Sequence, residues 1–354
     1  MSNTFLWGIL VTALAGLIMG TSPWPIKLMR HFQFEHFAVV SMPLALVILP
    51  WAITLAFCPQ PFAALGEVKR SVLLKANLFA FSWGIAQVLA MLCFVRIGVS
   101  LTYGILCSIG AAVGVVTPMI FKASGIFGKG PDIFSQTGLM ILAGAAILVV
   151  GVAFASLAGA NRERKKNGSA PENKTASNSN ATAPGGFAAG LAMVVIAGVL
   201  SAGWGFAFMY CQDPIIAAMK ARGAGEISAN AAVWAVALLG AALPNLLYPV
   251  FLLTRNRSWG VIRAWPNEIG LSAVYGVLFF APSILLGIGM RLLGELGPSV
   301  GWGLVQGTLI LGGQLLGFAS GEWRGVSGRP RRQIYVAILI LIAAMAVMAL
   351  AKLK

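Results

Sequence analysis

Long apolar runs, unbroken by charge, fill most of this chain and limit what it can fold into more than any other feature. Apolar side chains make up 58% of its 354 residues and charged side chains only 10%, against roughly a quarter in soluble domains. A helix needs ~20 apolar residues to cross the ~30 Å hydrocarbon layer. Because backbone amides in hydrocarbon must be satisfied within their own segment, such runs predict helices rather than barrel strands.

Ten runs are long enough to cross a membrane. They cover residues 5–22, 37–58, 72–95, 100–121, 136–159, 187–210, 227–253, 269–290, 297–320 and 333–351. The sequence therefore predicts an all-α integral membrane protein with ten transmembrane helices.

A hydrophilic segment interrupts this pattern in the middle of the chain. Residues 161–184 carry almost no large apolar side chain and are rich in Asn, Ser, Thr, Ala and Lys. Such a composition cannot offset the entropy lost on ordering, so we expect residues 161–185 to form a disordered tether. The tether would join two five-helix halves, residues 1–160 and 186–354.

The net charge of +15 comes from Lys and Arg residues scattered singly or in small groups between the apolar runs. This distribution is typical of membrane topology and argues against a nucleic-acid partner. Fifteen of the 25 basic residues lie after the odd-numbered runs, and five of those lie in the tether. The positive-inside rule then predicts a cytoplasmic tether and periplasmic termini.

The two halves share a sequence pattern. Residues 96–105 and 295–304 repeat glycines, a serine and an aromatic residue at a constant offset of 199. Ala15-Gly16 and Ala197-Gly198 recur in the first run of each half. Because five is an odd number, the second copy would enter the bilayer from the opposite side, which predicts an inverted 5+5 repeat typical of transporters. Chance similarity between apolar segments is the alternative.

Several short motifs occur in a fixed order along the chain. They lie at residues 48–53, 83–85, 96–105, 117–118, 201–203, 206–207, 322–323 and 328–330. With this series the chain resembles the L-rhamnose/proton symporter family, within the drug/metabolite transporter superfamily of ten-helix carriers. The resemblance covers nearly the full length apart from the tether. It implies proton-driven sugar uptake across a bacterial inner membrane, with alternating access around a midplane cavity. Residues 297–306 depart from the polar, Tyr- and His-bearing stretch expected there, which leaves substrate and coupling open.

Two Trp/Gln pairs are the main candidates for sugar binding. Trp83 precedes Gln87, and Trp302 precedes Gln306, each by four residues, so both members of a pair share one helix face. An indole can cover the C–H face of a sugar, and an amide at membrane depth needs a partner or a cavity. Equally, each Gln could bond a neighbouring helix while the Trp packs.

Other polar or aromatic residues within the runs are weaker candidates. Gln314 lies two turns beyond Gln306, beside a Gly-X-X-X-Gly spacing that favours close helix packing. The remaining candidates, for which packing is the favoured role, are Tyr103, Trp204, Tyr275, Ser283 and Asn245.

Proton coupling requires a group that titrates. The acidic residues avoid the middle of every run, and Glu295 and Asp213 come nearest, so they are the coupling candidates. His31 and His36 both fall in the first short loop. Charges expected to be structural are Arg96, which corresponds to Glu295 in the repeat and could pair with it, and Glu322, Arg324 and Arg329 in the last loop.

The sequence thus favours a secondary transporter that imports a small sugar, such as L-rhamnose, with protons. Its partners would be the sugar, the proton and the lipid bilayer, with no cofactor or metal. No phosphate-binding loop, zinc site or catalytic triad is recognisable, so an enzyme is not expected. The alternatives are an exporter or exchanger of metabolites or drugs with an apolar, aromatic cavity, and a membrane sensor that binds without transport.

Overall fold

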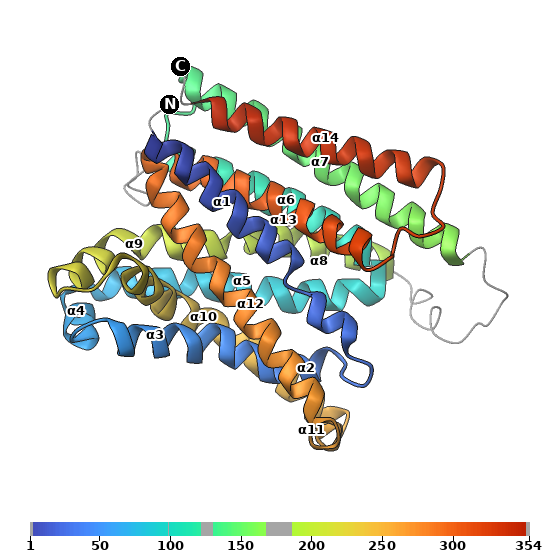
Figure 1. Cartoon of the computed structure of the whole chain (residues 1–354), viewed down its shortest axis with the longest axis horizontal. Coiled ribbons are helices and arrows are strands. Elements are labelled where there is room, and N and C mark those ends of the chain that lie inside the picture. Colours follow the sequence, from blue (N-terminus) through green and yellow to red (C-terminus); the bar gives the residue numbers. More distant parts are fainter. Residues whose placement is uncertain (1–2, 98, 122–129, 168–185, 352–354) are drawn as a thin grey trace.

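The computed structural model describes residues 3–97, 99–121, 130–167 and 186–351 as a bundle of long helices (Figure 1). Within these ranges, ten helical segments are long and apolar enough to cross a membrane. Each overlaps one of the ten predicted runs. The prediction of an all-α integral membrane protein is confirmed.

The first five spans bring the chain back and forth through the bundle. They are α1 (Asn3–Thr21), α2 (Phe34–Pro43) continued by a π-helical turn and α3 (Leu49–Phe57), α5 (Arg70–Ile97), α6 (Val99–Ile120) and α7 (Gln136–Asn167). A short helix, α4 (Pro61–Glu67), joins the second and third spans.

The other five spans follow the central segment. They are α8 (Gly186–Ser201) with α9 (Gly203–Ala221), α10 (Glu226–Arg255), α12 (Pro266–Leu292), α13 (Trp302–Ala319) and α14 (Arg329–Leu350). The short helix α11 (Trp259–Ala264) precedes α12. The first turn of α1 and the last turn of α14 lie at the same end of the bundle (Figure 1).

Two helix ends differ from the sequence prediction. Helix α2 begins at Phe34, before the predicted 37–58 run, because Gln33 and His36 cap its first turn reciprocally. His36 therefore lies inside a helix and not in the loop where we expected it. Helix α7 continues to Asn167, seven residues into the predicted tether. The rest of that tether, residues 168–185, lies outside the described residues.

Contacts with the last loop and with the first turns of α14 explain why α7 extends past its apolar part. The Asn161 amide donates to Gln333 Oε1 at 2.8 Å, and Arg162 pairs with Glu322. The Arg162 guanidinium also lies 5.1 Å from the ring centroid of Trp323. These contacts give the polar end of the helix partners that its own sequence does not supply.

Three spans are interrupted near prolines or small residues. A π-helical turn, Leu44–Ile48, follows Pro43, and another, Gly297–Gly301, precedes α13. A turn at Ala202 separates α8 from α9. Such interruptions free backbone groups from the helical ladder and occur often at functional sites.

The helices pack in a regular set of neighbours. Helix α7 runs along α14 at one edge of the bundle, as the green and red ribbons show (Figure 1). Helix α1 packs on α12 and α13, while α8 packs on α5 and α6. Other helices in contact are α5 with α10, α2 with α12, α6 with α7, and α13 with α14.

An ion-pair cluster ties the short helical segment Trp24–Leu28 after α1, the end of α7 and the α13–α14 loop together at the end opposite the termini. Glu322 pairs with both Lys27 and Arg162. Burial alone would favour the neutral carboxyl, but the hydrogen bond from Lys27 and the charge of Arg162 outweigh it and hold the pKa of Glu322 below its usual value. At the other end, Glu67 pairs with Arg222, whose hydrogen bond lowers the pKa of that carboxyl.

Replacing Glu322 with Gln is expected to lower stability in a pH-dependent way. The lowered folded-state pKa stabilises the fold above the ordinary carboxyl pKa of about 4.3, and this contribution is lost as the pH falls through the folded value. Glu322→Gln should therefore unfold at a lower temperature than the wild type at pH 7 in detergent. The difference should shrink towards acidic pH, while the exposed Glu295→Gln should match the wild type throughout. Equal wild-type and Glu322→Gln stability at pH 7 would show that the cluster contributes nothing.

Candidate substrate site

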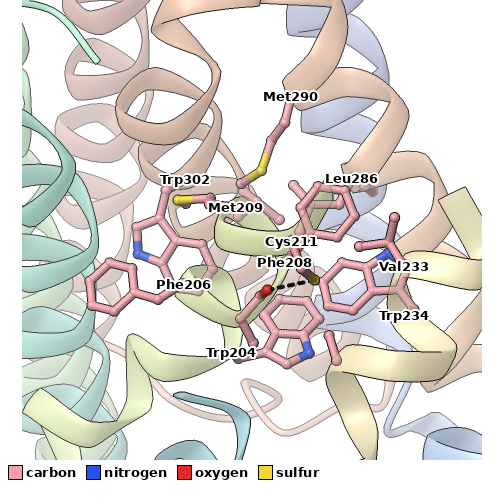
Figure 2. Packing of buried hydrophobic residues seen from close by; sticks show 14 of the residues in the cluster. Trp204, Phe206, Phe208, Met209, Cys211, Val233, Trp234, Leu286, Met290 and Trp302 are labelled. Carbon is pink, nitrogen blue, oxygen red and sulfur yellow. Dashed lines mark hydrogen bonds between the residues drawn. The ribbon is translucent and has the colours of Figure 1, made fainter. Parts of the chain in front are cut away.

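An aromatic cluster centred on Trp204 lies where helices of both predicted halves meet. Its ring centroid lies 5.0 Å from that of Trp234 on α10, 6.0 Å from that of Trp302 on α13 and 6.3 Å from that of Trp83 on α5. Phe279 on α12 contacts Trp83 at 6.1 Å. All four indoles are 9% exposed or less. Figure 2 shows the Trp204, Trp234 and Trp302 rings gathered around α9.

The indole N–H groups of this cluster have different partners. Trp302 Nε1 donates to the Gly110 carbonyl oxygen at 3.1 Å, and Trp234 Nε1 donates to that of Ser283 at 2.8 Å. Trp204 Nε1 is buried with no hydrogen-bond partner among the described residues. Because buried donors are almost always satisfied, this N–H is an exception, unlike those of Trp302 and Trp234.

Trp302 is wedged between helices of the two halves. A Cβ added at Gly114 on α6 would overlap the Trp302 ring, and one added at Gly205 on α9 would lie 2.5 Å from it. Only glycine leaves room for the indole at these two positions. Together with its bond to Gly110, this contact makes Trp302 a packing residue as well as a neighbour of Trp204.

The helix interruptions lie next to Trp204 and Trp302 in the sequence, and one of them carries a further polar group. Trp204 follows the turn at Ala202 by two residues, and Trp302 directly follows the π-helical turn Gly297–Gly301. Ser299 in that turn is fully buried, and its hydroxyl has no hydrogen-bond partner among the described residues. Broken helices that expose polar groups within the bilayer are the usual place for substrate in transporters.

Gln87 and Gln306 each lie on the same helix face as the tryptophan one turn before. Gln87 is half-buried one turn beyond Trp83 on α5, and Gln306 is half-buried one turn beyond Trp302 on α13. Gln314 is also half-buried, two turns further along α13. Their partial exposure leaves the amides able to meet a ligand.

The weaker candidates differ in their surroundings. Tyr103 on α6 is 53% exposed, and Tyr275 on α12 is half-buried. Ser283 is buried, and its backbone oxygen accepts the Trp234 bond. Asn245 is buried and donates to the Ala241 carbonyl oxygen of its own helix at 2.9 Å. The tyrosines are thus better placed to reach a ligand than Ser283 or Asn245.

The charged candidates lie away from the aromatic cluster. Glu295 and Asp213 are both exposed, in the turn before α13 and on α9. Among the described residues Arg96 reaches the Met193 sulfur and not Glu295. Arg329 is exposed at the first position of α14, and Glu322 belongs to the ion-pair cluster described above.

Two groups of residues near this site were not singled out from the sequence. Trp234 and Phe279 are single aromatic residues within long apolar runs, which no local pattern distinguishes from core. Gly110 and Gly114 lie four residues apart on α6, but nothing in the sequence indicated that Trp302 fills the space beside them. Their roles depend on contacts between segments far apart in the chain.

The arrangement suits a small ligand with one apolar face and hydroxyl groups. Aromatic rings can cover C–H groups, while the Trp204 N–H and the half-buried amides can bond hydroxyls. Among the described residues, no three His, Cys, Asp or Glu side chains are grouped so as to hold a metal ion.

Comparison with known proteins agrees with this architecture. The chain matches the family model described as L-rhamnose-proton symport protein (RhaT) over residues 1–353. It is 26% identical over 352 residues to the L-rhamnose-proton symporter of Salmonella dublin, covering 97% of each chain. It is also 26% identical over 328 residues to that of Klebsiella pneumoniae, covering 90% of each, and 25% identical over 352 residues to that of Cronobacter sakazakii, covering 97% of each. The chain is therefore a multi-pass membrane protein that belongs to the L-rhamnose-proton symport protein (RhaT) family.

Proposed function

We propose that this protein imports L-rhamnose or a similar deoxyhexose together with protons. The relatives named above are L-rhamnose-proton symporters. The observation that carries the proposal is the buried Trp204 N–H without a partner, surrounded by aromatic rings. A sugar hydroxyl would accept this N–H, while the Trp83 and Trp204 rings cover the methyl and C–H groups of the deoxyhexose.

Transport would use alternating access between residues 1–160 and 186–354, related as an inverted repeat. Support comes from the helix neighbours, because several pairs have a counterpart five spans away. The contacts of α1 with α12 and α13 correspond to those of α8 with α5 and α6, and α6–α7 corresponds to α13–α14. The Trp204 cluster draws on α5 from one half and on α9, α10, α12 and α13 from the other.

Ion pairs between the halves would hold each end shut in turn. Glu67–Arg222 joins them at the end nearest the termini, and Glu322 joins Lys27 and Arg162 at the opposite end. We place the second end in the cytoplasm of a bacterium and both termini in the periplasm, because Lys and Arg accumulate in the segments of the second end. The membrane is then the inner membrane.

Gln87→Ala and Gln306→Ala are each expected to weaken L-rhamnose uptake several-fold, since one hydrogen bond contributes about 1 kcal/mol, or roughly fivefold in affinity. The KM for uptake should rise while the amount of protein in the membrane stays unchanged. Gln136→Ala, at an exposed position on α7, is the matched control. Normal KM values in both variants would mean that the two amides only pack.

Uptake of labelled L-rhamnose into membrane vesicles, with and without an imposed pH gradient, tests the proposed function. Faster, concentrative uptake when the outside is acidic is expected. If the rate and extent of uptake do not depend on the pH gradient, the proposal of proton symport is wrong. If no sugar is taken up, the proposal that this protein imports sugars is wrong.

Export of an apolar metabolite or drug is the second candidate function. The observation in its favour is the strongly aromatic and apolar character of the cluster, which includes Phe206 and Phe208 beside the tryptophans (Figure 2). Gradient-driven efflux of an aromatic cation from the same vesicles, without L-rhamnose uptake, would support this function instead.

A further inference from the structure

His36 occupies an unusual position for a histidine in a membrane protein. It is one of two histidines in the chain, it lies in the first turn of α2, and it is only 3% exposed. His31, the other one, has a side chain that is 39% exposed and stacks on Trp265 with a centroid separation of 3.4 Å. Histidine is the side chain that normally changes charge between pH 5 and 8. A buried histidine at the start of a span is thus a candidate proton-binding group.

The hydrogen bonds of His36 couple its protonation state to the helix end. The Gln33 backbone N–H donates to His36 Nδ1 at 2.9 Å, so this nitrogen carries no proton in the present structure. His36 Nε2 then carries the proton, and it is buried with no hydrogen-bond partner among the described residues. If a second proton bound to Nδ1, the N–H group formed there would point at the Gln33 N–H, and two hydrogen-bond donors would repel each other. Binding that proton therefore requires the capped turn at Gln33 to open, and Gln33 is exposed at the surface.

The segment before α2 is fixed to α12, so opening of the capped turn would displace the start of α2 and not this segment. The Glu268 carboxylate accepts the backbone N–H groups of Arg30, His31 and Phe32 at 2.7–3.2 Å, and it contacts His31 Nδ1 at 2.9 Å. Glu35, beside His36, is buried and accepts a bond from Asn256 Nδ2 at 2.9 Å.

Several other groups could influence a charge at His36. The titratable and charged residues on α2 and on the elements packed against it in this region are Arg30, His31, Glu35, Tyr248, Arg255, Arg263, Glu268 and Tyr275. Both acidic members are already engaged in hydrogen bonds, Glu35 with Asn256 and Glu268 with the preceding segment. His36 differs from these residues because it is buried and its Nε2 has no hydrogen-bond partner among the described residues.

A continuous series of ring contacts leads from the first turns of α2 to the aromatic cluster. Phe37, next to His36, contacts Tyr275 at 5.9 Å, and Tyr275 contacts Phe279 at 6.0 Å. Phe279 contacts Trp83, which contacts Trp204. A movement of the α2 start would thus be transmitted by direct packing to the candidate sugar site.

We infer that His36 binds the transported proton and that the loss of its bond to Gln33 couples this proton to the movement of α2. The inference rests on the proposed proton symport. The proton adds to Nδ1 of the neutral imidazole and later leaves this nitrogen for water at the end of the bundle where α2 begins. No other bond is made or broken except the hydrogen bond from Gln33.

The variant His36→Gln removes the side chain that can bind a proton but keeps the helix cap, so it tests proton binding without disturbing the fold. A glutamine at the third position of a helix forms the same capping box, because its side-chain oxygen accepts the N–H of the capping residue. The variant should fold, keep counterflow exchange of labelled L-rhamnose in proteoliposomes, and lose accumulation driven by a pH gradient. One pH unit supports about tenfold accumulation in a symporter that moves one proton per sugar, so the expected loss is about tenfold.

Two further variants complete the experiment. His31→Gln removes the exposed histidine and should accumulate L-rhamnose like the wild type. His36→Glu also forms a capping box but titrates at lower pH, so its accumulation should return with a pH profile displaced to the acidic side. Accumulation by His36→Gln at the wild-type level, or loss of counterflow together with accumulation, would overturn the assignment. If the wild type itself shows no gradient-driven accumulation, the proposed symport fails, and that outcome is distinct from a failure of His36 alone.

Discussion

Replacing Trp204 with alanine is expected to weaken L-rhamnose binding, and so its transport, by roughly a hundredfold. The change removes both an aromatic surface and the buried N–H that has no partner among the described residues. Buried aromatic anchors of this kind contribute on the order of 2–4 kcal/mol to binding, so affinity should fall by roughly a hundredfold. Counterflow of labelled L-rhamnose in proteoliposomes measures this loss without involving the proton.

A milder variant separates binding from folding at the same position. Trp204→Phe keeps an aromatic ring but lacks the N–H, and its KM should rise about tenfold, as expected for one lost hydrogen bond in a buried site. Trp7→Phe, at a 61% exposed position on α1, is the matched control. A normal KM in Trp204→Phe would mean that the N–H does not bind the sugar.

Gly114→Leu is expected to destabilise the protein more than any other single change considered. Because even a Cβ at Gly114 would overlap the Trp302 ring, a leucine must displace the indole from its bond to Gly110. Overpacking of this kind costs about 3 kcal/mol or more. The fraction of folded protein recovered in detergent and its unfolding temperature should both fall.

The control for this prediction is another helical glycine. Gly270 on α12 is exposed, and a Cβ built there meets nothing within 4 Å, so Gly270→Leu should leave the unfolding temperature unchanged. The smaller ring in Gly114→Ala/Trp302→Phe should restore part of the stability lost in Gly114→Ala. If Gly114→Leu is as stable as Gly270→Leu, Trp302 is not wedged between the halves.

The fold was largely predictable because the bilayer constrains span length and charge so strongly. The errors arose where side chains cap or extend a helix. Helix α2 begins at Phe34 because His36 and Gln33 cap it, and histidine is not the residue that signals such a cap in a sequence. Helix α7 extends because Arg162 meets Glu322, which lies 160 positions away.

The candidate site was only partly predictable. Helical spacing placed Trp83 and Gln87 on one face of a helix, but it could not say which helix that face meets. The bond of Trp302 to Gly110 spans 192 positions, so its packing role depended on tertiary structure alone. Trp204 looked like an ordinary core residue in the sequence, and its importance emerged from its unpartnered N–H in a crowded cluster.

The pH of a weakly buffered suspension of proteoliposomes tests the account most directly. Adding L-rhamnose outside wild-type proteoliposomes should make the medium transiently alkaline, because the proposed symport would carry protons inward with the sugar. A protonophore should abolish this signal, and sucrose should not produce it. Entry of labelled L-rhamnose without any pH change, or no entry at all, would contradict the proposal that this protein is a rhamnose–proton symporter.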